Sequence, residues 1–170
     1  MTSEVEIRPE RPDDIDAIGE LIDSAFFGMP YADGDEADLV KELRAQDALS
    51  VSLVAELEGT IVGQVAFSPA RAPGGMAGWY ALGPVAVVPA RQRSGIGSTL
   101  VRAGIEAISE LGALGCILTG DPAYYSRFGF EPAPQNAPPG EPAEFFMVKL
   151  LAGRLPADPI RFHEAFGGAV

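Results

Sequence analysis

One stretch, residues 85–100, constrains the fold of this chain more than any other. It starts as a β-branched run that ends at Pro89, and it finishes with the apolar spacing of a helix that begins at Gly95. The turn between them, residues 92–97, carries an arginine and two glycines. A helix N-terminus offers unpaired backbone N–H groups to a phosphate, and glycine lets the phosphate come close. The stretch therefore predicts a phosphate-binding strand–turn–helix unit.

The remaining periodicity predicts a mixed α/β chain. Alternating or β-branched runs predict strands over residues 5–8, 51–58, 61–68, 79–88, 114–119, 130–131, 145–150 and 160–162. Helical spacing predicts helices over residues 15–26, 35–45, 95–111 and 123–128. The Gly83–Pro84 step predicts a bulge that opens a slot in the sheet just before the phosphate turn. Strands 79–88 and 114–119 are expected to run parallel, because a crossover helix joins them. The proline-rich residues 132–142 predict a mobile loop.

Length and charge narrow the class of protein. A chain of 170 residues without a repeat or linker predicts one ordinary domain. Its net charge of −12 argues against nucleic acid as a partner, and 16 of its 24 acidic residues precede residue 60. This acidic segment is either a solvated surface or a face that attracts cationic amines. No apolar run is long enough for a bilayer and the acidic start is not a signal peptide, so we expect a cytoplasmic protein without membrane partners.

Cysteine and histidine give no metal signal. The single cysteine, Cys116, excludes an internal disulfide, and its apolar neighbours predict an inert core residue. The single histidine, His163, lies in the tail and is expected to pack or face solvent. His, Cys and carboxylate residues show no metal-ligand spacing, so we expect no metal.

Two motifs resemble the GNAT N-acetyltransferases. Residues 92–97, Gln-Arg-Ser-Gly-Ile-Gly, fit the Gln/Arg-x-x-Gly-x-Gly/Ala signature, and residues 124–130 are similar to the family's aromatic-tyrosine segment that ends in Gly-Phe. Residues 120–125 also resemble the YhbS-like subgroup of bacterial acetyltransferases. Each motif is weak alone, but the two occur in the family's order with a helix and a strand between them. The resemblance covers residues 4–150, and residues 151–170 are expected to form a C-terminal extension packed on the same domain.

The resemblance implies a mixed, mostly antiparallel sheet with two splayed parallel strands at its centre and helices on both faces. It implies acetyl-CoA as the co-substrate and a primary amine, on a small molecule or a protein, as the acceptor that attacks the thioester directly. Tyr125, four residues before Gly129, takes the position of the family's general acid. The backbone implied to bind the pantetheine arm is that of Val85, Ala86 and Val87. The backbone implied to bind the pyrophosphate is that of Gln92, Arg93, Ser94, Gly95, Ile96, Gly97 and Ser98.

Alternatives stay open at each position. The turn is otherwise a plain connection capped by Ser94, and Tyr125 is otherwise an aromatic packed on the sheet. Many GNAT proteins carry a glutamate on the strand before the bulge, but residues 79–88 contain no acid. Deprotonation of the amine then goes through ordered water or through Asp121, which is otherwise a turn residue.

The missing acid keeps a second class of function open, a non-catalytic acyl-CoA sensor or partner-binding module. A mononucleotide-binding module is disfavoured, because no Lys–Ser/Thr pair follows the glycines. The sequence names neither the acceptor nor the oligomeric state, although many GNAT proteins pair through their C-terminal strands into homodimers.

Overall fold

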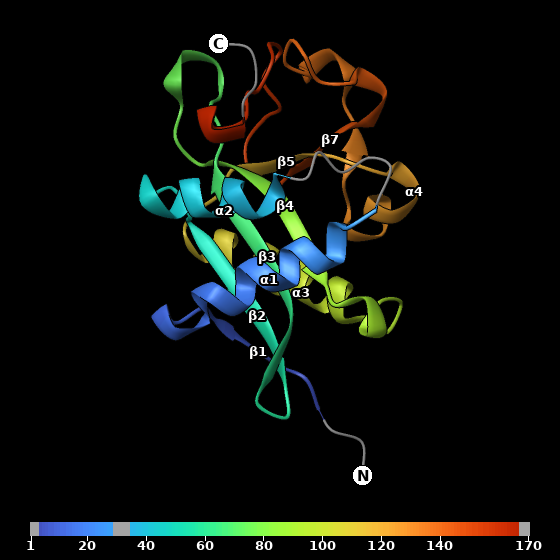
Figure 1. The fold of residues 1–170 in the computed structure, drawn as a ribbon. Helices are drawn as coiled ribbons and strands as arrows, with labels where there is room; N and C mark the ends of the chain where they lie inside the picture. Colours follow the sequence, from blue (N-terminus) through green and yellow to red (C-terminus); the bar gives the residue numbers. More distant parts are fainter. Residues whose placement is uncertain (1–3, 29–34, 167–170) are drawn as a thin grey trace. The chain divides into compact units, whose positions relative to one another are not determined.

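The computed structural model describes residues 4–28 and 35–166 (Figure 1). The chain divides into two compact units, one from Met1–Phe67 and Gly83–Ile105 and the other from Ser68–Leu82 and Glu106–Val170. Strand β4 (Trp79–Val87) and helix α3 (Ile96–Glu110) each supply residues to both units.

Seven strands pair in the order β1-β2-β3-β4-β5-β7-β6. Besides β4, their bounds are β1 Glu6–Pro9, β2 Val51–Leu57, β3 Thr60–Pro69, β5 Gly115–Thr119, β6 Glu131–Pro132 and β7 Phe146–Leu150. The pairs β1–β2, β2–β3, β5–β7 and β6–β7 are antiparallel, whereas β4 and β5 are parallel. The predicted fold class is confirmed: a mostly antiparallel mixed sheet with one parallel pair.

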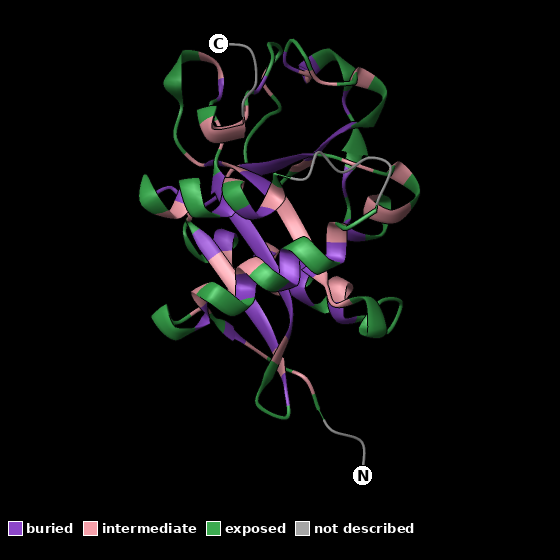
Figure 2. Cartoon of the chain, viewed as in Figure 1, coloured by how far each residue is buried: buried purple, intermediate pink, exposed green. Residues whose placement is uncertain are grey.

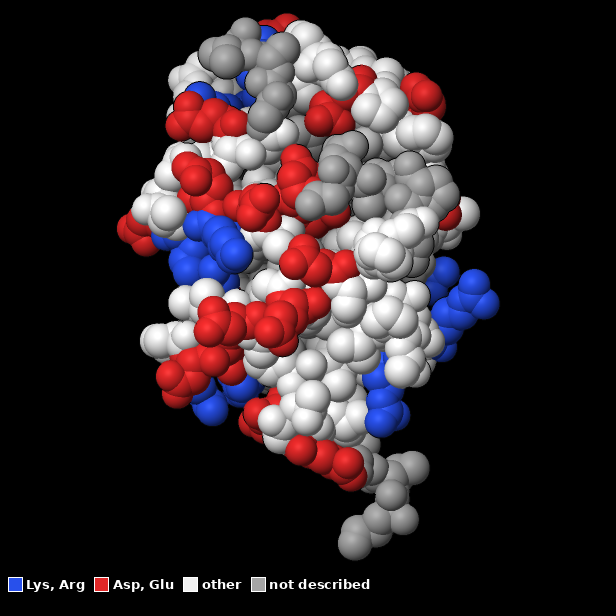
Figure 3. Space-filling view, viewed as in Figure 1, with Lys and Arg blue, Asp and Glu red and all other residues white. Residues whose placement is uncertain are grey.

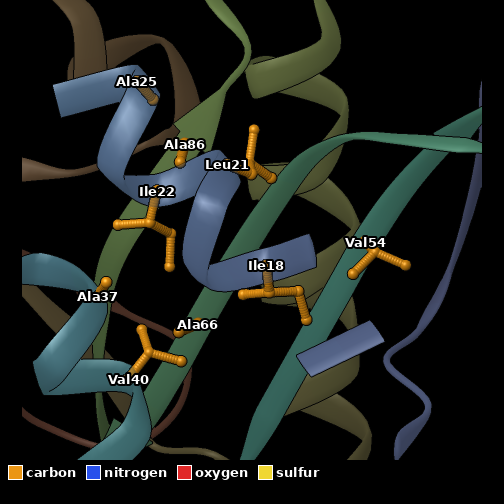
Figure 4. Close-up of a cluster of buried hydrophobic side chains, with 9 residues drawn as sticks. All are labelled: Ile18, Leu21, Ile22, Ala25, Ala37, Val40, Val54, Ala66 and Ala86. Atoms are coloured by element: carbon orange, nitrogen blue, oxygen red, sulfur yellow. The ribbon is translucent and has the colours of Figure 1, made fainter. Parts of the chain in front are cut away.

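In the first unit, α1 (Ile15–Phe26) and α2 (Glu36–Ala45) cover one face of β2 and β3 (Figure 1). Both helices have an apolar stripe at helical spacing, so each buries one face and leaves the other in solvent (Figure 2). The apolar side chains of the two helices point at the strands. They pack with side chains of β2, β3 and β4 in a cluster of Ile18, Leu21, Ile22, Ala25, Ala37, Val40, Val54, Ala66 and Ala86 (Figure 4).

Helix α3 packs on the opposite face of β3. Neighbouring residues of a strand point to opposite faces, so Ala66 meets α1 and α2 while Phe67 points toward α3. Two glycines let helix and strand approach closely. A Cβ on Gly63 would lie 2.9 Å from Leu100 Cδ1, and a Cβ on Gly104 would lie 2.6 Å from Phe67 Cζ.

Gly104→Ala should destabilise the protein by about 1–3 kcal/mol, because the Phe67 ring is fully buried and has no room to retreat. Gly19→Ala on α1 is the matched control, since its nearest atom would be Lys41 Cε at 3.9 Å. That control should be neutral or stabilising by up to about 1 kcal/mol from helix propensity. Urea unfolding of both variants measures the difference. Equal stabilisation at the two positions would contradict the close packing of α3.

In the second unit, one face of β4, β5 and β7 buries a core of Ala72, Trp79, Ala81, Ile117, Ala133, Phe146, Val148 and Ile160. The predicted strand at residues 160–162 is reduced to a single bridge between Arg71 and Arg161. The proline-rich segment predicted as a mobile loop contains a fully buried residue, Asn136, whose amide donates to Pro156 O at 2.7 Å and to Asp158 O at 3.0 Å. These bonds tie the proline-rich segment to the C-terminal residues.

Cys116 lies on β5 with no exposed surface, and burial raises the pKa of its thiol. The prediction of a buried, unreactive core cysteine is therefore supported by its environment. Among the described helices, none combines the length and apolar character needed to cross a bilayer.

Candidate active site

The predicted phosphate turn lies in the first unit, between the end of β4 and the start of α3. Arg93 has φ 65° and Gly95 has φ 90°, both in the left-handed region. A side-chain-bearing residue in that region costs about 1–3 kcal/mol, and such strain is typical of ligand-binding turns. Left-handed residues within a turn direct successive N–H groups into an anion-binding hollow. The backbone of this turn therefore resembles the left-handed turns that bind anions.

Side chains brace the turn from within. Gln92 Nε2 donates to Val87 O at 3.1 Å, which ties the turn to the end of β4. The Ser94 hydroxyl donates to Arg91 O, so it closes the turn rather than reaching into α3. Gly95 O accepts the first helical bond, from Thr99 N at 3.0 Å. Residues 91–95 are exposed, as a coenzyme contact requires.

The three residues implied to hold the pantetheine arm lie at the end of β4, beyond the part that pairs with β5. The parallel register with β5 covers Trp79–Gly115, Tyr80–Cys116 and Ala81–Ile117, and it stops before the cis Gly83–Pro84 peptide. The register with β5 therefore includes none of residues 85–87, although β4 itself continues to Val87. Ala86 points into the core of α1 and α2, and Val85 and Val87 are half-buried.

Tyr125 lies in the second unit, at the end of the short helix α4 (Pro122–Tyr125) that follows β5. Asp121 caps this helix by accepting a hydrogen bond of 3.0 Å from Ala123 N. Of the two interpretations that the sequence left open for Asp121, base or turn residue, this bond supports the turn residue. The Tyr125 ring lies over Gly120, where a Cβ would come within 2.5 Å of Tyr125 Cε2. Phe128 and Phe130 hold the ring from its other sides, each with its centroid 6.2 Å from that of Tyr125. The ring is half-buried and fixed at the carboxyl end of β5.

The adjacent tyrosine has a different environment. The guanidinium of Arg127 stacks 4.5 Å from the centroid of the Tyr124 ring, and Arg127 Nε donates to Tyr124 O at 2.9 Å. Tyr124 therefore packs with Arg127 and also meets the Tyr125 ring edge-on, with the two centroids 4.9 Å apart, and Tyr125 is the tyrosine that lies over Gly120 at the strand end.

Sequence reasoning missed a carboxylate at this strand end. Glu141 Oε2 accepts a hydrogen bond of 2.9 Å from the hydroxyl of Thr119, the last residue of β5. The two residues are 22 positions apart, so no local pattern pairs them. Among the described residues, no group of three or more His, Cys, Asp or Glu is arranged to hold a metal ion.

Carboxylates also gather on the outer face of the first unit, over α1 and α2 (Figure 3). The exposed acidic residues on these two helices are Asp16, Glu20, Asp23, Asp38 and Glu42. This placement agrees with the acidic N-terminal face expected from the sequence.

The comparison with protein families agrees with this architecture. The model of the acetyltransferase (GNAT) family matches residues 15–130. The uncharacterised N-acetyltransferase YhbS of Escherichia coli K12 is 38% identical over 126 residues, which cover 74% of this chain and 72% of YhbS. The uncharacterised N-acetyltransferase YjhQ of the same strain is 36% identical over 143 residues, with 77% of each chain covered.

Two solved structures superpose closely. A GNAT-family acetyltransferase from Brucella melitensis, in complex with acetyl-CoA, has a TM-score of 0.86 and 40% identity over 96% of this chain and 98% of that one. The YhbS protein of E. coli, in complex with CoA, has a TM-score of 0.87 and 32% identity over 99% of this chain and 94% of that one. Sequence, fold and the strained turn before α3 thus agree, and the chain belongs to the GNAT family of acetyltransferases.

Proposed function

We propose that this protein is an N-acetyltransferase that moves the acetyl group of acetyl-CoA to a primary amine by direct attack. The observation that carries the proposal is the turn before α3, where Arg93 and Gly95 are both left-handed. Left-handed residues direct the backbone N–H groups of a turn toward an anion, and this turn is exposed just before the start of α3. The acetyl-CoA complex of the B. melitensis relative supports the same co-substrate for this chain.

Separate groups of the chain then bind the coenzyme, stabilise the oxyanion and protonate the leaving thiolate. The N–H groups of residues 92–98 bind the pyrophosphate at the start of α3, where the helix dipole favours negative charge. The backbone of Val85–Val87 pairs with the amide groups of the pantetheine arm. A backbone N–H near Val85 stabilises the oxyanion that forms when the amine attacks the thioester carbon. Tyr125 gives its phenolic proton to the departing thiolate.

Thiol release from acetyl-CoA over a panel of primary amines tests the proposal. We expect thiol release that depends on both acetyl-CoA and an amine. Calorimetric binding of acetyl-CoA without turnover on any amine would instead support the acyl-CoA sensor. Binding of ATP in preference to acetyl-CoA would support a mononucleotide module.

Gly95→Glu should weaken acetyl-CoA binding about tenfold more than Gly95→Gln, because a carboxylate within a few ångströms repels the pyrophosphate. The two side chains have the same length and meet the same left-handed strain, so their difference isolates the charge. Calorimetry at low and high salt measures the dissociation constants, and the gap should shrink at high salt. Equal affinity of two folded variants would place the pyrophosphate elsewhere.

A further inference from the structure

We infer that Glu141 is the proton acceptor for the amine and that Thr119 positions it; the inference rests on the proposed function. Residues 79–88 carry no acid, and Asp121 lies in the turn before α4, where its Oδ1 accepts from Ala123 N. The reaction still needs a base, because at neutral pH most of a primary amine is ammonium, whose nitrogen has no lone pair. Glu141 supplies a carboxylate at the carboxyl end of β5.

Glu141 is held in place by hydrogen bonds of both its side chain and its backbone N–H. Its Oε2 accepts from Thr119 Oγ1 at 2.9 Å, and its own N–H donates to Pro138 O at 3.2 Å. Pro138, Pro139 and Pro142 flank Glu141 in the sequence, and each proline fixes one φ angle of this segment. The strand end to which it is bound is itself fixed, because Gly120 N donates to Phe145 O at 2.9 Å. The side chain is half-buried, and as a carboxylate it has a second acceptor oxygen, Oε1, besides the one bonded to Thr119.

The placement relative to Tyr125 suits an acid–base pair. Thr119 and Gly120 are consecutive, so Thr119 holds the carboxylate while Gly120 lies under the Tyr125 ring. The Cβ position of Gly120, which lies next to the Tyr125 ring, is also 3.2 Å from Leu118 Cδ1. Tyr125 therefore lies on the same side of the strand end as the Leu118 side chain. Because strand side chains alternate, Thr119 points to the other side. The base and the acid thus meet the strand end from opposite faces, one for the amine and one for the thiol.

The ammonium gives one proton to Glu141, and its nitrogen lone pair then attacks the thioester carbon. The C–N bond forms and the C–S bond breaks, and the thiolate takes the proton of Tyr125. The remaining excess proton on nitrogen passes through water to the tyrosinate, and Glu141 returns its own proton to solvent. The other charged or titratable side chains on the elements that meet here are Cys116, Asp121, Tyr124, Arg127, Glu131, Glu144 and Lys149.

The test compares Glu141→Gln with Glu144→Gln, an exposed glutamate three positions away in the same segment. With an amine that the unsubstituted protein acetylates, Glu141→Gln should lower kcat/KM about 100-fold at neutral pH. The deficit should narrow as pH rises toward the pKa of the amine, because solvent then removes the proton. Thr119→Val should lower kcat/KM about fivefold with the same dependence on pH, since it removes only the hydrogen bond. Glu144→Gln should match the unsubstituted protein, and calorimetry should give one dissociation constant for acetyl-CoA in all four proteins.

Two results separate the inference from the proposed function. If the unsubstituted protein acetylates an amine and Glu141→Gln leaves kcat/KM unchanged, or lowers it equally at every pH, Glu141 is not the proton acceptor. The proposed acetyltransferase activity then still stands. Absence of turnover on every amine overturns both.

Discussion

Tyr125→Phe should lower kcat for acetyl transfer by about 100- to 10,000-fold, the range over which a positioned general acid contributes. The leaving thiolate needs a proton, and the phenol at the end of α4 is the group proposed to give it. Phenylalanine keeps the ring that lies over Gly120 and packs between Phe128 and Phe130, so the fold should not change. The dissociation constant of acetyl-CoA should stay at its original value, because the loss is confined to the reacting step.

Tyr124→Phe is the matched control. It removes the same hydroxyl from the adjacent residue and retains the ring that stacks with Arg127. We expect full activity from this variant in the same thiol-release assay. If both variants kept full activity, Tyr125 would be an aromatic packed at the end of β5, and the proton would come from elsewhere. If both lost activity equally, the effect would belong to the packing of α4 rather than to one phenol.

Local patterns predicted most of the fold. Helical spacing gave α1, α2 and α3 to within one or two residues, because each buries a single apolar face. β-branched runs bounded by turns gave β2, β3 and β5 equally well. The segments that depend on distant partners were less predictable. The proline-rich segment is anchored by Asn136 through carbonyls 20 and 22 residues later in the chain, which no local pattern indicates.

The candidate site divides in the same way. The turn before α3 and the tyrosine after β5 are local motifs, so the sequence located both. The sequence could not show that the Gln92 side chain bonds the end of β4 or that Asp121 is used up as a helix cap. Nor could it show the bond between Thr119 and Glu141, since the proline-rich segment must fold back onto β5 to form it. The strand expected to carry the base has no acid, and the carboxylate proposed in its place, Glu141, reaches the end of β5 only through folding, so no spacing in the sequence indicates it.

A second expectation concerns the start of α1. Arg8 and Asp14 are each only 8% exposed, and they form a two-pronged ion pair with distances of 2.7 and 3.1 Å. Asp14 Oδ2 also accepts from Arg11 N at 2.7 Å, and Glu56 lies 3.4 Å from the same guanidinium. Asp14→Ala should destabilise the protein by about 3 kcal/mol, because it removes the short ion pair of the buried Arg8 guanidinium and leaves it the 3.4 Å contact with Glu56 and a 3.1 Å hydrogen bond to Pro9 O. The exposed neighbour gives the control, as Asp13→Ala should change the unfolding free energy by less than about 0.5 kcal/mol.

The dependence on pH identifies the charge as the cause. The hydrogen bond from Arg8 lowers the pKa of Asp14 below its ordinary value of 3.8, and the Arg11 N–H acts in the same direction. The unfolded chain therefore takes up this proton at a higher pH than the folded chain does. The stabilisation is complete above about pH 4 and is lost as pH falls through the folded pKa. Urea unfolding at a series of pH values should show the unsubstituted protein and Asp14→Ala converging in acid. A gap that stayed constant into strong acid would mean that Asp14 stabilises through packing, with neither the ion pair to Arg8 nor the charged hydrogen bond from the Arg11 N–H contributing.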